Sequence, residues 1–197
     1  MTPFHILYPG ETLVLASASP RRRELLTQAG IPFVCHPADI DESAIEASSP
    51  EELVQKLASL KSLAIAQKLH TTQLILGADT VVALGSKIFG KPATLSEAAA
   101  MLRALSGRTH AVITGVALRR REQCITKACI TSVTFKALSD NDIAHYHSLL
   151  NPLDKAGAYA IQEHGDLIIE SIEGSRTNVI GLPMELVKEL LSANSLA

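Results

Sequence analysis

The chain has 197 residues, of which 47% are hydrophobic and 19% are charged, with a formal net charge of −2 and a pI near 6.4. This length suits a single domain with a substantial core, and the balanced charge argues against a general nucleic-acid-binding protein. Because the three cysteines lack C-x-x-C spacing and neither a signal peptide nor a membrane-length apolar run is recognisable, we expect a cytoplasmic protein with reduced thiols and no membrane association.

The first half of the chain alternates between predicted strands and helices. The patterns predict extended segments at 13–16, 31–36 and 74–84, and helices at 20–29 and 50–69. The first helix has Ser19 as its N-cap, Pro20 at its first position and Gly30 just past its end. The segment 74–84 is mostly apolar, as expected of a strand that is buried on both faces.

The second half of the chain breaks this alternation. A capping box at 94–97 begins a short helix that ends near residue 106. The later predicted elements are an antiparallel hairpin of 110–120 and 124–138, a helix at 139–150, strands at 156–162 and 166–172, and a closing helix from 183. Since the hairpin interrupts the strand and helix alternation, we predict an α/β fold with a mixed β-sheet flanked by helices.

Three consecutive arginines, Arg21, Arg22 and Arg23, open the first predicted helix. Exposed cations there oppose the positive end of the helix dipole, at a cost of about 0.3–1 kcal/mol each. A polyphosphate bound at the turn 17–19 would turn this repulsion into attraction, because backbone N–H groups, Arg21 and Arg22 would then all bind one anion. The alternative is a helix start with solubilising arginines, and we expect Arg23 to face solvent.

The most unusual residue is Asp79, a carboxylate inside the apolar segment 74–84. Burying an unpaired carboxylate costs several kcal/mol, so Asp79 needs a cation, a metal ion or a position open to a cleft. A structural salt bridge is the alternative to a functional role. Glu42, next to Asp41 in a polar loop, offers further oxygen ligands for Mg²⁺, although acidic pairs in loops are commonly only exposed.

Two lysines lie in turns that restrict their backbone. Lys91 stands between Gly90 and Pro92, which makes a stiff loop suited to aiming an ammonium group, and Lys155 lies in a similar glycine-containing turn. Each alone is also typical of a solvated lysine. The run 119–121 offers contacts to a nucleic-acid backbone but is more typical of a solvated hairpin end.

Several short motifs occur along the chain in one particular order. They read LASASPRRRELL, DES, LGADTVV, GKP, LSGRTHAVITGVAL, PLDKAGAYAIQ and GSRTNVIGLP. In order and spacing the chain resembles, from about residue 13 to 191, the Maf family of nucleoside triphosphate pyrophosphatases. The resemblance implies one Maf-like domain over 1–197, with a mixed sheet and one or two lobes around a deep cleft, similar to the inosine triphosphatase fold. It also implies a possible homodimer.

The resemblance implies a reaction as well: hydrolysis between the α- and β-phosphates, giving a monophosphate and pyrophosphate, with Mg²⁺ or Mn²⁺. At matching positions, the residues implied to bind substrate are Ser17, Arg21, Arg22, Lys61, Thr80 and Gln162. Those implied to take part in catalysis are Asp79, Lys91 and Glu42. Asp79 and Glu42 would also bind the metal, and whether Asp79 acts as a general base or as a metal ligand stays open.

Thr80 and Gln162 favour the branch of the family that acts on dTTP and UTP. A glutamine amide supplies both a donor and an acceptor, which suits a pyrimidine edge without excluding other bases. Arg176 stands where that branch usually carries tyrosine, and residues 162–166 replace a more glycine-rich segment. The alternatives are therefore another base preference, such as 7-methyl-GTP, or a non-catalytic nucleotide-binding regulator of septum formation.

Overall fold

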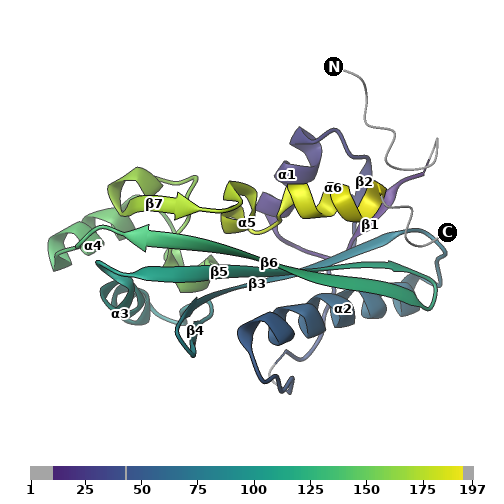
Figure 1. Ribbon diagram of the computed structural model, residues 1–197, viewed down its shortest axis with the longest axis horizontal. Coiled ribbons are helices and arrows are strands. Elements are labelled where there is room, and N and C mark those ends of the chain that lie inside the picture. Colours follow the sequence, from purple (N-terminus) through teal and green to yellow (C-terminus); the bar gives the residue numbers. More distant parts are fainter. Residues whose placement is uncertain (1–10, 43, 193–197) are drawn as a thin grey trace.

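The computed structural model describes residues 11–42 and 44–192, which fold around a seven-stranded sheet (Figure 1). The strands are β1 (Leu13–Leu15), β2 (Phe33–Cys35), β3 (Ile75–Leu84), β4 (Lys87–Phe89), β5 (Thr109–Arg120), β6 (Gln123–Phe135) and β7 (Ile169–Glu173). Their order is β2-β1-β3-β5-β6-β7, with β4 also beside β3. Because β1 pairs in parallel with β2 and β3 while β3 to β7 pair antiparallel, the predicted mixed α/β sheet is confirmed.

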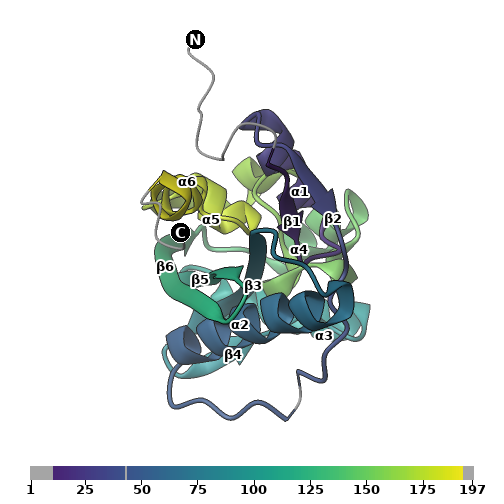
Figure 2. The ribbon, with the colours of Figure 1, turned by 90° about the vertical axis from the view of Figure 1, so that its right-hand side faces the viewer.

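Helices cover both faces of this sheet (Figures 1 and 2). They are α1 (Pro20–Gln28), α2 (Pro50–Leu69), α3 (Leu95–Leu105), α4 (Asp140–Ser148), α5 (Arg176–Ile180) and α6 (Met184–Ser192). In Figure 1, α2 lies below the long strands, whereas α1, α5 and α6 lie above them. Among residues 11–42 and 44–192, no helix has both the length and the apolar character needed to cross a bilayer.

The apolar residues form two large cores at different ends of the long strands. One core joins β1 and the start of β3 to α1 and α6, with Leu15, Leu26 and Leu182 at its centre. The other joins α3 and α4 to the far ends of β5 and β6, around Leu102 and Phe135. The sheet is continuous between the two cores, so both support the middle of β3.

Two glycines allow α2 to lie unusually close to the sheet. A Cβ atom added to Gly77 would clash with the backbone carbonyl of Ala58, and one added to Gly115 would clash with backbone atoms of Val54. Since backbone atoms cannot move aside as side chains do, a larger residue here would push α2 away from β3 and β5. This close packing decides how far the side chains of α2 reach over the strands.

The structure corrects several of the predicted elements. The strand predicted at 156–162 is wrong: the segment is a short 3₁₀ turn, η2 (Ala156–Ala158), followed by irregular backbone. It stays buried because Ala160 N–H and C=O both bond to the Tyr146 hydroxyl, each at 3.0 Å, in place of a strand partner. The strand predicted at 166–172 begins only at Ile169, after the turn η3 (Gly165–Leu167), and β4 and α5 were not predicted.

The arginine run at the end of β5 also differs from the solvated hairpin end that was predicted. Of these three arginines, only Arg121 is exposed. Arg119 is buried against the hydroxyls of Ser59 and Ser62, and Arg120 pairs with Glu11. The three cysteines are free, as predicted, and partly buried.

Candidate active site

A cleft opens where one edge of β3 loses its strand partners. On that edge β1 pairs with Ile75 and Leu76, and β4 pairs with the segment 82–84. Residues 77–81 lie between these two pairings, with no described strand beside them on this edge. A cavity of about 720 Å³ fills the gap. Because successive side chains of a strand point to opposite faces, Asp79 and Thr80 enter this space from the two faces of β3.

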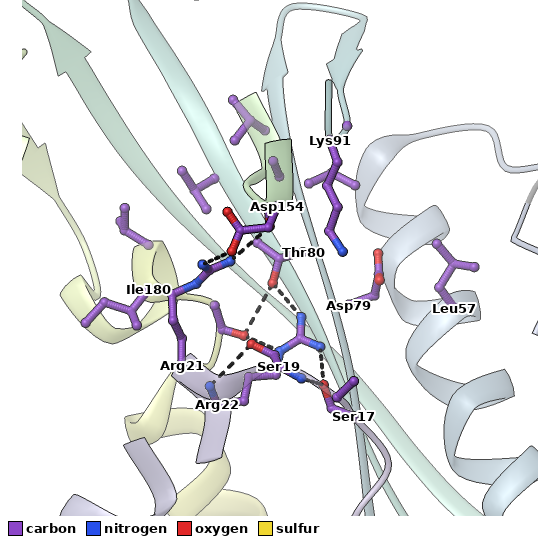
Figure 3. A pocket seen from close by; sticks show the side chains of 18 of the residues that line it. Ser17, Ser19, Arg21, Arg22, Leu57, Asp79, Thr80, Lys91, Asp154 and Ile180 are labelled. Carbon is purple, nitrogen blue, oxygen red and sulfur yellow. Dashed lines mark hydrogen bonds and ion pairs between the residues drawn. The ribbon is translucent and has the colours of Figure 1, made fainter. Parts of the chain in front are cut away.

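The cleft brings together every residue that the sequence marked for substrate binding, catalysis or metal binding. Its lining includes Ser17, Arg21, Arg22, Glu42, Lys61, Asp79, Thr80, Lys91 and Gln162. They come from the β1–α1 turn, α1, the loop before α2, α2, β3, the loop after β4 and the segment after η2. Figure 3 shows the arginines and Asp79 on different sides of the strand, with Lys91 pointing into the same space.

On the α2 side of β3, one lysine holds two carboxylates. Lys61 Nζ lies 2.6 Å from Asp79 Oδ1 and 2.8 Å from Glu42 Oε1. The side chains of Lys61 and Asp79 are 12% and 11% exposed, whereas that of Glu42 is 52% exposed. Asp79 thus has both the cation and the open cleft position that its burial requires. Its Oδ2 atom has no hydrogen-bond or ion-pair partner among the described residues.

The donors on this side fit a hard divalent cation. Two carboxylates share a single ammonium group, so they leave an excess of negative charge at the cleft wall. Within the described part of the chain, no group of three His, Cys, Asp or Glu side chains is placed to hold a metal ion. A cation at Asp79 and Glu42 would therefore take its other ligands from water and substrate, which is the arrangement that Mg²⁺ commonly adopts with phosphates.

On the opposite face of β3, Arg22 is held by neutral acceptors. Its guanidinium makes four hydrogen bonds: Nε donates to Gly181 O (2.8 Å), Nη1 to Ala78 O (2.8 Å) and Ser17 Oγ (3.2 Å), and Nη2 to Thr80 Oγ1 (3.0 Å). Ala78 O lies at the gap in the β3 edge, where Arg22 takes the place of a neighbouring strand as its hydrogen-bond donor. Burial lowers the pKa of Arg22 from its ordinary value, although nearby Asp79 opposes this shift. Because four of its N–H donors are used inside the protein, Arg22 acts mainly through its charge and by shaping the wall.

The start of α1 contributes a second arginine at the mouth of the cleft. Ser19 caps the helix by accepting from the Arg22 N–H at 3.5 Å. Arg21 reaches across to the turn η1 (Pro152–Asp154), where its Nη1 lies 3.6 Å from Asp154 Oδ2 and its Nη2 donates to Asp154 O at 3.4 Å. Arg23 is exposed, as predicted.

Two further polar side chains face the cleft without a partner. Lys91 and Gln162 are exposed in its lining, and neither side chain makes a hydrogen bond or ion pair within the described residues. The N–H of Gly157 donates to Gly90 O at 3.0 Å, which joins the turn of Lys91 to the segment that leads to Gln162. Both side chains are therefore available to a ligand, one as a cation and the other as a paired donor and acceptor.

Some residues of the site were not marked by the sequence. Asp154 lines the cleft and holds Arg21, and Gly181 O receives hydrogen bonds from Arg22 and, at 3.3 Å, from Thr80 Oγ1. The role of a backbone carbonyl cannot be recognised from residue types, and the sequence around Asp154 is typical of an ordinary turn. Lys155 is buried instead of pointing into the cleft.

Taken together, the mixed sheet and a cleft lined by cations and carboxylates define an α/β protein with a site suited to a polyanion. A family model described as Maf-like protein matches residues 12–194, and this chain belongs to that family. A dTTP/UTP pyrophosphatase from Myxococcus xanthus is 51% identical over 172 residues, which cover 87% of each chain. Another dTTP/UTP pyrophosphatase, from Moorella thermoacetica, is 49% identical over 183 residues, which are 91% of this chain and 93% of that one.

Solved structures support the fold at much lower sequence identity. The Ham1 protein of Staphylococcus aureus is 14% identical with a TM-score of 0.55, covering 94% of this chain and 100% of that one. A HAM1 protein from Coxiella burnetii is 16% identical with a TM-score of 0.54, covering 95% and 100%. Arg176, which departs from the expected family pattern, is exposed on α5 and is not part of the cleft lining.

Proposed function

We propose that this protein hydrolyses nucleoside triphosphates, dTTP and UTP in preference to others, to the nucleoside monophosphate and pyrophosphate. The observation that carries the proposal is the composition of one cleft: two carboxylates and a lysine on one face of β3, and arginines at a helix N-terminus on the other. Membership of the Maf family and the names of its relatives support the same reaction.

The cations would bind the triphosphate along the cleft. At the start of α1, Pro20 has no N–H and the Arg22 N–H is bonded to Ser19 Oγ, so this helix end would bind the phosphates through the Arg21 N–H and the Arg21 side chain at the cleft mouth. Arg22, fixed by its four hydrogen bonds, adds a positive charge that needs no reorganisation. Lys91 enters from the opposite side, where it would neutralise the charge that builds on the leaving pyrophosphate.

Asp79 would accept the proton from the water that attacks the α-phosphorus. Oδ1 is held by Lys61, so the carboxylate has a fixed orientation and Oδ2 is left available in the cleft. Glu42 completes the acidic side of the site through the same lysine. A divalent cation held by Asp79 and Glu42 would, when bound, polarise the phosphate oxygens and share their negative charge.

The base would lie toward Thr80 and Gln162. Thr80 Oγ1 bonds to Arg22, to Thr114 Oγ1 at 2.9 Å and to Gly181 O, so its hydroxyl has a defined direction. The free amide of Gln162 offers a donor and an acceptor side by side, which complements the O4 and N3–H groups of uracil and thymine. Since Arg176 does not line the cleft, its departure from the family pattern does not argue against pyrimidine substrates.

A product assay tests the proposal. The purified protein is incubated with Mg²⁺ and each of dTTP, UTP, CTP, ATP, GTP and 7-methyl-GTP, and the monophosphate, diphosphate, pyrophosphate and phosphate are resolved. We expect monophosphate and pyrophosphate, formed fastest from dTTP and UTP. A different best base would overturn the base preference alone. Diphosphate and phosphate as products, or nucleotide-dependent stabilisation without turnover, would overturn the reaction.

A further inference from the structure

Lys155 is a buried cation next to the cleft that the proposed reaction does not use. The residue is 4% exposed and is absent from the cleft lining. Its ammonium donates to Asn151 O at 2.9 Å and Asp154 Oδ1 at 2.9 Å, and it lies 3.2 Å from Glu163 Oε1. An ammonium group has three N–H donors, so these three oxygens can satisfy it completely.

These contacts join the two ends of an irregular segment. Residues 151–163 contain η1, η2 and two residues with positive φ, Gly157 (φ 69°) and Ala158 (φ 64°), and they form no strand. Without a ladder of backbone hydrogen bonds, the segment depends on side chains for its shape. Lys155 ties its start at Asn151 to its end at Glu163, which is the neighbour of Gln162 in the sequence.

The same ammonium also acts on the phosphate side of the cleft. Asp154, which Lys155 holds through Oδ1, presents Oδ2 to Arg21 at 3.6 Å. Partial burial acts to raise the pKa of Asp154, but Lys155 and Arg21 together keep it below its ordinary value, so the carboxylate stays ionised between them. Lys155 therefore stands between Arg21 on one wall and the residue beside Gln162 on the other (Figure 3 shows Asp154 facing Arg21).

We propose that Lys155 is a positioning residue for base selection: by tying Asp154 to Glu163, it fixes the wall that carries Gln162 and the direction of Arg21. The proposal rests on the proposed function, in which Gln162 reads the base. Since the ammonium is buried and fully engaged, Lys155 acts through these neighbours and not by touching the substrate. A lysine needed only for stability would affect all nucleotides alike.

The test measures discrimination between UTP and CTP, which differ at the edge that Gln162 would read. Lys155→Met removes the ammonium, and Glu163→Gln removes only its tie to the end of the segment. Because the Glu163 side chain is 43% exposed, this second variant should fold even where Lys155→Met does not. The matched control is Glu122→Gln, the same chemical change at an exposed position in the β5–β6 turn.

Each variant is assayed for the ratio of kcat/KM for UTP to that for CTP, with Mg²⁺. Affinities for α,β-methylene analogues of UTP and CTP are measured by calorimetry, so that discrimination is also read without turnover. We expect the UTP to CTP ratio to fall about tenfold in Lys155→Met and about fivefold in Glu163→Gln, mainly through KM for UTP, while the control keeps the wild-type ratio. Combining Lys155→Met with Glu163→Gln should add little to Lys155→Met alone.

The outcomes separate this proposal from the proposed function. If the wild-type protein does not hydrolyse UTP but binds its analogue more tightly than that of CTP, and the variants lose this preference, the reaction is wrong and the role of Lys155 stands. An unchanged ratio in Glu163→Gln would overturn the positioning role, as would equal losses for UTP and CTP in both variants. A wild-type protein with no preference between the two analogues or substrates would overturn it too.

Discussion

The two faces of β3 at the cleft hold their cations in opposite ways. On the α2 face, Lys61 is bound by two carboxylates, one of which is half exposed. On the other face, Arg22 is bound by two backbone carbonyls and two hydroxyls, and none of these partners carries a charge. Asp79 and Thr80, adjacent in sequence, each belong to one of these arrangements.

This difference indicates which face of β3 can take part in a reaction. A carboxylate such as Asp79 or Glu42 can accept a proton and brings a negative charge to a bound cation, whereas backbone carbonyls such as Ala78 O and Gly181 O are neutral and do not accept a proton near neutral pH. The α2 face is therefore suited to catalysis. On the other face, Arg22 covers the open edge of β3 and supplies a fixed positive charge, so its role is both structural and electrostatic.

The largest effect on activity should come from Asp79→Asn, which keeps the shape of the side chain and removes its charge. We expect kcat with UTP to fall at least about 100-fold, the usual contribution of a general base. Thermal unfolding should show a folded protein, because Lys61 keeps Glu42 as its partner. If kcat stayed within a few-fold of wild type, Asp79 would be a structural residue, and the α2 face of β3 would not be the catalytic one.

Arg22→Lys tests the other face by keeping the charge while losing the fork of donors. A lysine cannot reach four acceptors arranged around a guanidinium, so buried carbonyls are left unpaired. We expect the free energy of unfolding to fall by about 3 kcal/mol, measured by urea denaturation. Arg23→Lys is the matched control at an exposed position of the same helix and should change little. Equal stability of the two variants would contradict the structural role of Arg22.

Gly115→Ala tests whether the position of Lys61 on the α2 face of β3 depends on the close packing of α2 against the sheet. The new Cβ would clash with the backbone of Val54, so α2 must move and Lys61 would lose its position over Asp79. A destabilisation of about 3 kcal/mol is expected, together with a lower kcat. Gly30→Ala, which meets no atom within 4 Å but has φ +67°, carries backbone strain alone and should leave kcat unchanged. Normal kcat in Gly115→Ala would show that the reach of Lys61 does not depend on this contact.

A smaller effect concerns pH and a residue outside both faces. His110 is 3% exposed beside the Tyr159 hydroxyl (Nε2 to Oη 2.9 Å), and burial lowers its pKa from 6.5 to about 4. Between these two pKa values, His110 is protonated in the unfolded chain but neutral in the folded chain. The free energy of unfolding is therefore unaffected by His110 above pH 6.5 and falls as the pH drops toward 4. We expect a loss of about 2 kcal/mol from pH 7.5 to 5 attributable to His110.

Urea unfolding at several pH values checks this, with His110→Gln as the non-titrating comparison. The variant should have a shallower pH dependence over the same range. Identical slopes for both proteins would show that the acid sensitivity does not come from His110.

The site was predictable where a residue contradicted its local pattern. Asp79 stands out in an apolar strand, and three arginines stand out at a helix start, because each costs free energy unless something compensates for it. These anomalies pointed to Asp79, Arg21 and Arg22, which do line one cleft, whereas Arg23 does not. The mixed sheet was predictable in the same local way, since a hairpin interrupts an alternating pattern.

What escaped prediction depends on contacts between distant segments. The stretch 156–162 has the composition of a strand, but its backbone is satisfied by Tyr146 and by Gly90. The gap in the edge of β3 arises from where β1 and β4 end, which no single segment records. The partners of Arg22 are mainly backbone carbonyls, so its structural role is invisible in a list of residue types.

Hydrolysis of UTP in ¹⁸O-labelled water with Mg²⁺, followed by mass spectrometry of both products, shows directly which phosphorus atom the water attacks. Attack of water on the α-phosphorus predicts one ¹⁸O atom in UMP and none in pyrophosphate. Label in the pyrophosphate, or UDP and labelled phosphate as products, would show that water attacks a different phosphorus atom and would contradict the proposed reaction.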